Sequence, residues 1–326
     1  MRTIVIAALL FALGRLPLAA QTPDKVHFLM DWIPTGEHAA YYAGWQHGIF
    51  TAHGIDVTIT RGYGSGDTVS KVAAGAAQFG VADVSAVFTA RARGGAMVKT
   101  VMAIYTASPH SLFVLKSSVI TSFKGLEGKK IAITPGNSHK LYFPEVARRA
   151  GTDPEKIVWV NTDASAMAAM LIAKRVDAAP FYDIHQYYIN KAAEKAGEEI
   201  VALPFVRTGF AIYAASIMTT DDMIAKNPDL VKRFLAAVKE SFAWAKQHPQ
   251  EACQLHRQRN PEVEQDDCEH SLAKVLEYVF NPSQEKAGTG KFDAERMTFT
   301  WKAVADAQQL DPSWDYHQAL DTEFVP

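Results

Sequence analysis

Short apolar runs alternate with helical patterns through most of the chain. Residues 26–30 and 55–59 each form such a run, and each is followed by a helical pattern, at 39–47 and 68–77. A strand followed by a helix and then by another strand is typical of α/β folds with a largely parallel sheet. Further strands are predicted at 79–82, 100–104, 112–115, 130–134, 156–160, 178–182 and 210–214.

The pattern changes after Thr220, where helical segments follow one another without intervening strands. The predicted helices cover 222–247, 249–256, 266–280 and 293–310, and Pro228 and Pro249 mark breaks in this region. The chain has 326 residues, which exceeds the size at which one hydrophobic core usually stops growing. We therefore expect two lobes, although no low-complexity linker separates them.

The amino terminus has the pattern of a secretory signal. Arg2 precedes an apolar run from Ile4 to Leu13, and small residues at Ala19 and Ala20 precede a polar stretch. Removal of residues 1–20 would leave 31 Lys and Arg against 35 Asp and Glu, a net charge of −4 instead of −2. We expect export to the periplasm without a lipid anchor, because no Cys follows the apolar run. The mild negative charge argues against nucleic acid as a partner.

Cys253 and Cys268 are the two cysteines of the chain and lie 15 positions apart. In an oxidising compartment they can form a disulfide, and the alternative is a pair of free thiols. Neither belongs to a metal-ligand or redox motif. The histidines are also scattered, without the short spacing of metal ligands. We therefore expect no metal site and no cofactor.

In open parallel sheets, ligands bind beyond the carboxyl ends of the strands, so the loops after the strands are the places to search. Several of these segments resemble the NMT1/THI5-like family, whose members bind thiamine pyrimidine precursors, sulfonates or nitrate. The resemblance covers about residues 26–245. It rests on Asp31-Trp32-Ile33-Pro34 with His38 and Tyr41, Gly48-Ile49-Phe50, the Gly-rich loop 62–66, residues 75–81, the Leu-x-Gly-Lys-Lys-Ile run within 123–133, and 176–183.

This resemblance implies a periplasmic substrate-binding protein of an ABC importer, acting as a monomer with a membrane permease as its partner. The implied fold is a type II periplasmic binding protein with two α/β lobes and two crossover strands that act as a hinge. We expect lobe 1 to comprise 21–112 and 212–326 and lobe 2 to comprise 113–211, with crossings near 112–115 and 210–214. A receptor is an alternative partner to a transporter.

The loop tips supply candidate ligand-binding groups. Trp32 offers a flat face on which a ring can stack, and the alternative is that it belongs to the core. The carboxylate of Asp183 can accept hydrogen bonds from a ligand amine, whereas Ser138 can equally be a helix cap. The full candidate set is Asp31, Trp32, His38, Tyr41, Gly64, Ser65, Gly66, Asp83, Ser85, Asn137, Ser138, His139, Tyr182 and Asp183.

Acidic residues outnumber basic ones at these loops, where only Arg61 and Arg207 could neutralise an anion. This balance favours a flat, neutral or amine-bearing heteroaromatic ligand of the thiamine-precursor type over a sulfonate, nitrate or aromatic carboxylate. The family that the chain resembles also includes pyrimidine synthases, which use a pyridoxal-phosphate lysine and a cysteine-rich loop with metal. Residues 62–67, where that loop would lie, contain no Cys, so we expect a binding protein and no enzyme.

Overall fold

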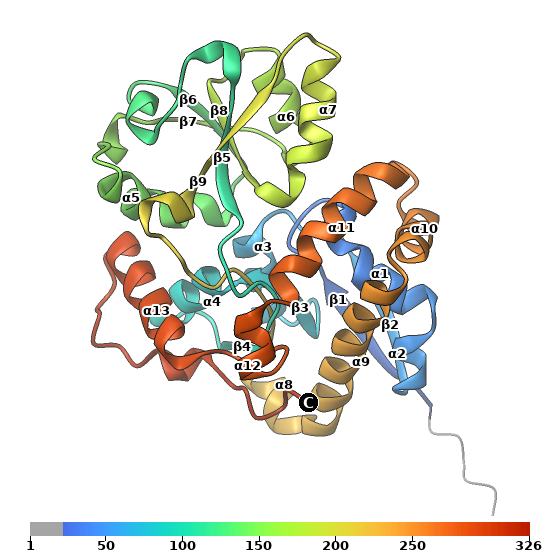
Figure 1. Cartoon of the computed structure of the whole chain (residues 1–326). Coiled ribbons are helices and arrows are strands. Elements are labelled where there is room, and N and C mark those ends of the chain that lie inside the picture. The colour runs from blue at the N-terminus through green and yellow to red at the C-terminus, as the bar shows by residue number, and fades with distance from the viewer. Residues whose placement is uncertain (1–21) are drawn as a thin grey trace, which may run out of the picture.

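The computed structural model describes residues 22–326 and contains two lobes, each built on a five-stranded sheet (Figure 1). The predicted signal segment lies outside the described residues. In the first sheet the strand order is β2 (Ile55–Thr60), β1 (Asp24–Leu29), β3 (Phe79–Asp83), β10 (Ala215–Thr220) and β4 (Val98–Ala103). In the second sheet it is β7 (Val158–Asn161), β6 (Lys130–Ile133), β8 (Ala178–Tyr182), β5 (His110–Leu115) and β9 (Ile200–Pro204).

Both sheets are mixed, with one strand reversed against the other four. β10 is antiparallel to β3 and β4, and β5 is antiparallel to β8 and β9. β3 is buried along its whole length, as expected for a strand covered by helices on both faces. β2 alternates between buried and exposed residues, as expected at a sheet edge. The expected two-lobed α/β architecture is confirmed. The sheets were expected to be largely parallel, and each is mixed because it contains one antiparallel strand.

The chain passes from the first sheet to the second over residues 104–109 and returns over 205–214 (Figure 1). The expected position of the first crossing was wrong, because 112–115 lie inside β5. Residues 210–214 are not a strand, and β10 begins directly after them. Phe210 and Ile212 are fully buried in this connecting segment. Their apolar character therefore reflects packing between the lobes and not strand pairing. β9 was also missed by the sequence pattern.

Helices cover the faces of both sheets (Figure 1). In the first lobe they are α1 (Ala39–Gln46), α2 (Ile49–Ala52), α3 (Ser65–Ala73) and α4 (Val84–Ala92), and in the second α5 (Ser138–Arg149), α6 (Ala164–Ile172) and α7 (Gln186–Glu194). The carboxyl-terminal part adds α8 (Asp221–Lys226), α9 (Pro228–Gln247), α10 (Pro249–Arg259), α11 (Gln265–Val279), α12 (Pro282–Ala287) and α13 (Ala294–Gln308). None of the described helices is long and apolar enough to cross a membrane.

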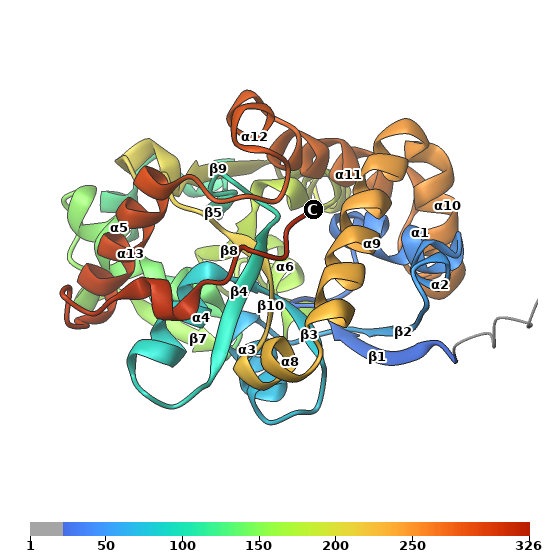
Figure 2. The ribbon, with the colours of Figure 1, turned by 90° about the horizontal axis from the view of Figure 1, so that it is seen from below.

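The carboxyl-terminal helices belong mainly to the first lobe. α9 and α10 begin at Pro228 and Pro249, where proline's fixed φ suits the first helical position. Phe234 of α9 stacks on Phe79 of β3 at a centroid distance of 3.9 Å, which fastens α9 to the sheet. α13 extends to the second lobe and lies beside α5 (Figure 2), where the Gln308 amide donates to the Leu141 carbonyl at 2.7 Å.

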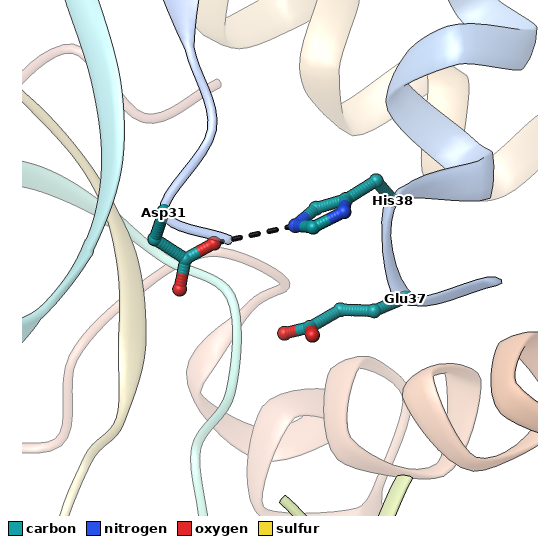
Figure 3. A group of neighbouring side chains, drawn as sticks. All are labelled: Asp31, Glu37 and His38. Carbon is teal, nitrogen blue, oxygen red and sulfur yellow. Dashed lines mark hydrogen bonds and ion pairs between the residues drawn. The ribbon is translucent and has the colours of Figure 1, made fainter. Parts of the chain in front are cut away.

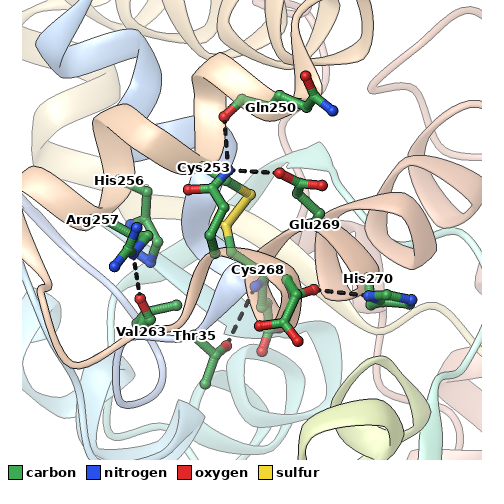
Figure 4. The surroundings of a disulfide bond; sticks show 12 residues. Thr35, Gln250, Cys253, His256, Arg257, Val263, Cys268, Glu269 and His270 are labelled. Atoms are coloured by element: carbon green, nitrogen blue, oxygen red, sulfur yellow. Dashed lines mark hydrogen bonds between the residues drawn. A yellow bond between two sulfur atoms is a disulfide. The ribbon is translucent and has the colours of Figure 1, made fainter.

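The disulfide between Cys253 and Cys268 is confirmed and joins α10 to α11 (Figure 4). Both cysteines are fully buried. Gly36 approaches the backbone of Cys268 so closely that a Cβ at position 36 would lie 2.5 Å from the Cys268 carbonyl oxygen. The disulfide-linked helices therefore support the loop that follows β1.

Candidate ligand-binding site

A narrow cavity lies where the two lobes meet. The lining residues come from the loops after β1, β2 and β6 and from the end of β8 with the loop that follows it, as expected for carboxyl ends of parallel strands. They are Asp31, Trp32, Glu37, Gly64, Ser65, Asn137, Ser138, His139, Pro180, Phe181, Tyr182 and His185.

Trp32 brings an indole ring from the first lobe into contact with the second. The ring is 9% exposed and joins an apolar cluster that includes Phe113 and Phe181 of the second lobe. The indole Nε1 has no hydrogen-bond partner. The neighbouring Asp31 carbonyl accepts a hydrogen bond from the Gly64 amide at 2.7 Å, which holds the loops after β1 and β2 together. Trp32 thus presents an apolar face and an unused donor at the cavity.

Asp31, Glu37 and His38 form a compact group at one side of the cavity (Figure 3). His38 Nε2 donates to Asp31 Oδ1 at 3.3 Å. Glu37 and His38 belong to the short 3₁₀ helix Gly36–His38, which begins with the Thr35 hydroxyl accepting from the Glu37 amide. This turn directs both side chains back toward Asp31.

Glu37 also contacts the second lobe. Its Oε2 lies 2.9 Å from His185 Nε2, and its Oε1 accepts a hydrogen bond from the Tyr105 hydroxyl at 3.2 Å. Burial, reinforced by the Asp31 charge, raises the pKa of Glu37 to about 8. Burial lowers the pKa of His185 to about 4. Burial thus disfavours the charged form of both groups.

Asp83 is fully buried where the first lobe meets the second. Its Oδ2 accepts hydrogen bonds from the Tyr182 hydroxyl at 2.9 Å and from His110 Nε2 at 3.1 Å, whereas its Oδ1 has no partner. His110 Nε2 also lies 3.4 Å from the Ser138 hydroxyl. These contacts close the two lobes on each other behind the cavity.

The amino terminus of α5 supplies three polar residues of the second lobe, namely Asn137, Ser138 and His139. Asn137 caps the helix by accepting from the His139 amide at 2.9 Å. His139 Nε2 donates to the Phe181 carbonyl at 3.0 Å, and burial lowers the pKa of His139. Ser138 therefore does not act as the cap, and its hydroxyl faces His110.

The structure separates the candidate residues into those that line the cavity and those that do not. Tyr41 packs edge-on against Phe28 and Phe242 in the first-lobe core. Asp183 lies on the outer side, where it accepts from the Tyr278 hydroxyl at 2.7 Å. The lining candidates are Asp31, Trp32, Gly64, Ser65, Asn137, Ser138, His139 and Tyr182; His38 and Asp83 contact lining residues; Tyr41, Gly66, Ser85 and Asp183 are not among the lining residues.

The candidate set did not include Glu37, Pro180, Phe181 and His185, all of which line the cavity. His185 lies only three positions after the predicted strand 178–182. A candidate set that extended further into the loop after that strand would have included it. Phe181 lies inside β8, where the alternation of side chains turns it toward Trp32. Sequence alone does not say which face of a fully buried strand meets the opposite lobe.

No Lys or Arg is among the residues that line the cavity in the described part of the chain. Arg61 lies over the ring of Tyr63 at 4.4 Å, and Arg207 lies in the 3₁₀ helix Phe205–Thr208 of the second-lobe side. The polar side-chain groups at the cavity are carboxyl groups, imidazoles, hydroxyls, the Asn137 carboxamide and the Trp32 indole N–H. Such a site offers acceptors to a ligand that carries N–H or O–H donors.

The model of the family described as NMT1/THI5 like matches residues 35–252. The chain belongs to the NMT1/THI5-like family. It is 27% identical over 317 residues to the riboflavin-binding protein RibY of Chloroflexus aurantiacus, covering 95% of this chain and 88% of that protein. It is 23% identical over 251 residues to a 4-amino-5-hydroxymethyl-2-methylpyrimidine phosphate synthase of Saccharomyces cerevisiae, covering 74% and 73% of the two chains.

Solved structures place this NMT1/THI5-like protein in the periplasmic binding protein fold. The alkanesulfonate-binding protein SsuA of Xanthomonas axonopodis superposes with a TM-score of 0.73 at 14% identity, covering 92% of this chain and 99% of that one. The periplasmic aliphatic sulphonate binding protein SsuA of Escherichia coli gives 0.68 at 16% identity, covering 92% of each. At such identities the likeness shows the fold alone.

Proposed function

We propose that this protein is the exported solute-binding component of an ABC importer and that its ligand is a small, flat heteroaromatic solute with hydrogen-bond donors. The observation that carries the proposal is a cavity between two lobes whose lining combines Trp32, Phe181 and Tyr182 with acidic and neutral acceptors. Aromatic faces contribute contact area for a flat ring. The predicted signal segment and the periplasmic neighbours support export, and a membrane permease is the partner that this role requires.

The electrostatics favour this ligand class over an anion. Sulfonate, nitrate and carboxylate sites use Arg, Lys or free helix amino termini, and no Lys or Arg lines this cavity in the described chain. A sulfonate would have to approach the carboxyl groups of Asp31 and Glu37. The anionic alternative would need Arg61 or Arg207 to reorient into the cavity.

Among flat solutes, an aminopyrimidine of the thiamine-precursor type is our first choice. The relatives named above act on or bind nitrogen heterocycles, a pyrimidine in one case and riboflavin in the other. The lobes approach so closely that the Gly66 amide donates to the Gly136 carbonyl at 3.0 Å, and this narrow space suits a single ring better than the three fused rings of riboflavin. Riboflavin would require the lobes to close less tightly.

A synthase function has less support. The family resemblance links that activity to a pyridoxal-phosphate lysine and to a cysteine-rich loop. No Lys lines the cavity among the described residues, and the two cysteines of the sequence are joined in the disulfide between α10 and α11. The remaining groups can bind and orient a solute without changing it.

A thermal-shift screen of the mature protein tests the proposal, followed by calorimetric titration of each hit. Hydroxymethyl-aminopyrimidines, riboflavin, alkanesulfonates, nitrate and aromatic acids are compared at equal concentration. A ligand at 100 times its Kd stabilises the folded state by about 2.7 kcal/mol. We expect a shift with the aminopyrimidines. A shift with sulfonates or nitrate alone would overturn the ligand class, and turnover of a heterocycle would overturn the binding role.

A further inference from the structure

Three metal-ligating side chains meet at the cavity, and all come from one loop and the short helix that follows it. Asp31, Glu37 and His38 are 4%, 2% and 1% exposed. A carboxylate oxygen of each acid and a ring nitrogen of His38 lie within 4.8 Å of one another (Figure 3). Ligand atoms around a tetrahedral ion with bonds of about 2.0–2.2 Å lie about 3.3–3.6 Å apart. Small side-chain rotations would therefore bring the three atoms around one ion.

The buried carboxyl groups beside the cavity are not paired with Lys or Arg in the described chain. Asp31, Glu37 and Asp83 are buried, and their ion-pair partners in the described chain are histidines and not Lys or Arg. Burying a carboxylate without a compensating charge is costly. A divalent cation between Asp31 and Glu37, whose oxygens lie within 4.8 Å of each other, would supply that charge.

A second observation points to a ligand at the same place. The Tyr41 side chain is 1% exposed and its hydroxyl has no hydrogen-bond partner. Tyr41 lies in the first turn of α1, three residues after His38. The Nδ1 atom of His185 is likewise buried without a partner. Unpaired buried polar atoms are rare in folded proteins, so a group that completes their bonding is expected nearby.

We propose that Asp31, Glu37 and His38 bind a divalent transition-metal ion of the zinc class, with His185 of the second lobe as the fourth ligand. His185 Nε2 already lies 2.9 Å from Glu37 Oε2, so the ion would connect the two lobes. The Tyr105 hydroxyl holds the other oxygen of Glu37 at 3.2 Å, the kind of outer contact that orients a metal-bound carboxylate.

The donor set decides the class of ion. Imidazole together with carboxylate suits zinc and its neighbours, whereas calcium and magnesium prefer oxygen ligands alone. His38 and His185 are far apart in sequence, which is why the absence of short histidine spacing led to the opposite expectation. This inference goes beyond the proposed function and does not depend on the identity of the organic solute.

Titration of the chelator-treated, dialysed protein with zinc chloride tests the site in the absence of any organic solute. Calorimetry and elemental analysis are expected to give one bound zinc per chain. Glu37→Gln and His38→Gln are expected to weaken zinc binding by about tenfold or more, since even outer-shell changes reach this size. The matched control is Glu240→Gln, which breaks the exposed contact between His53 and Glu240 at 2.8 Å and should leave the affinity unchanged.

Cobalt substitution gives a second, spectroscopic readout of the site. Visible absorption of a four- or five-coordinate cobalt ion is expected in the wild-type protein, and it should weaken in His185→Gln. Absence of stoichiometric zinc binding in the wild type, or equal affinity in the Glu37→Gln and Glu240→Gln proteins, would overturn the metal site. The proposed solute class fails separately if the chelator-treated protein binds added zinc but no aminopyrimidine.

Discussion

Single residues at this cavity carry two roles, one within a lobe and one between the lobes. Trp32 belongs to the first lobe by sequence, but its ring packs with Phe113 and Phe181 of the second. Glu37 and Asp83 are held by donors from the opposite lobe in the same way. A substitution at such a position acts first on lobe closure and ligand contact, and only then on the stability of either lobe.

Trp32→Ala tests this separation. We expect a loss of solute affinity of tenfold or more, because the stacking face is removed. The melting temperature without ligand should change little, since the contacts that are lost lie between the lobes. Calorimetric titration and thermal unfolding measure the two effects, with Trp159→Ala, outside the cavity lining, as the control. A large loss of stability with unchanged affinity would mean that Trp32 serves the core.

His256 is a buried residue whose titration should govern acid stability. It is fully buried against Tyr42, and burial, with the His38 charge as a smaller cause, lowers its pKa to about 3. The unfolded pKa is about 6.5. Because the folded pKa is the lower one, the neutral ring's contribution is complete above about pH 6.5. It is lost as the pH falls from there toward 3, with a slope of at most about 1.4 kcal/mol per pH unit.

Urea unfolding at pH 7, 6, 5 and 4 measures this effect in the wild type and in His256→Gln. The wild-type free energy of unfolding should fall more steeply with acid than that of the variant. Parallel curves for the two proteins would assign the acid sensitivity to other buried groups, of which His139 is the nearest equivalent.

At the scale of elements, the loop after β1 depends on the helices at the other end of the chain. Gly36 packs on the Cys268 backbone, and Cys268 is bonded to Cys253 of α10. The side chains of Glu37 and His38 follow directly after this contact. The disulfide is therefore placed to stabilise the fold and to hold the cavity-lining loop in position.

The double variant Cys253→Ser/Cys268→Ser is expected to lose about 3 kcal/mol of stability, since the bond closes a loop of 15 residues. Its affinity for the solute should fall as well, because the 3₁₀ helix 36–38 loses its support. Treatment with a reducing agent provides the control, which should destabilise the wild type and leave the double variant unaffected. Unchanged affinity in the variant would show that the loop is held without the disulfide.

At the scale of the whole molecule, closure brings backbone against backbone. The Gly66 amide of the first lobe donates to the Gly136 carbonyl of the second at 3.0 Å. A Cβ added at Gly64, which has a φ of +117°, would lie 2.9 Å from the Gly136 carbonyl atoms. No side chain fits between these loops while the lobes are closed, so the glycines set how near the lobes can approach.

Gly64→Ala should therefore favour the open form and weaken solute binding, with a larger radius of gyration in small-angle scattering. Gly75→Ala is the matched control, because Gly75 also has a positive φ, +78°, but nothing lies within 4 Å of its added Cβ. Both variants carry the backbone strain of a left-handed position, of order 1 kcal/mol, and only Gly64→Ala should alter closure. Equal radii and affinities in the two variants would contradict this account.

The sequence alone determined the two-lobed α/β fold and the loops that carry the cavity, because periodicity and loop residues are local signals. It also identified Trp32, Asp31 and the first turn of α5 as cavity candidates. Only the tertiary structure decided which faces meet: it buried Tyr41 in the core, turned Asp183 outward and brought His185 to Glu37. It likewise showed that 210–214 connect the lobes without forming a strand. These outcomes depend on contacts between distant segments, and no local pattern records which partner a buried side chain will meet.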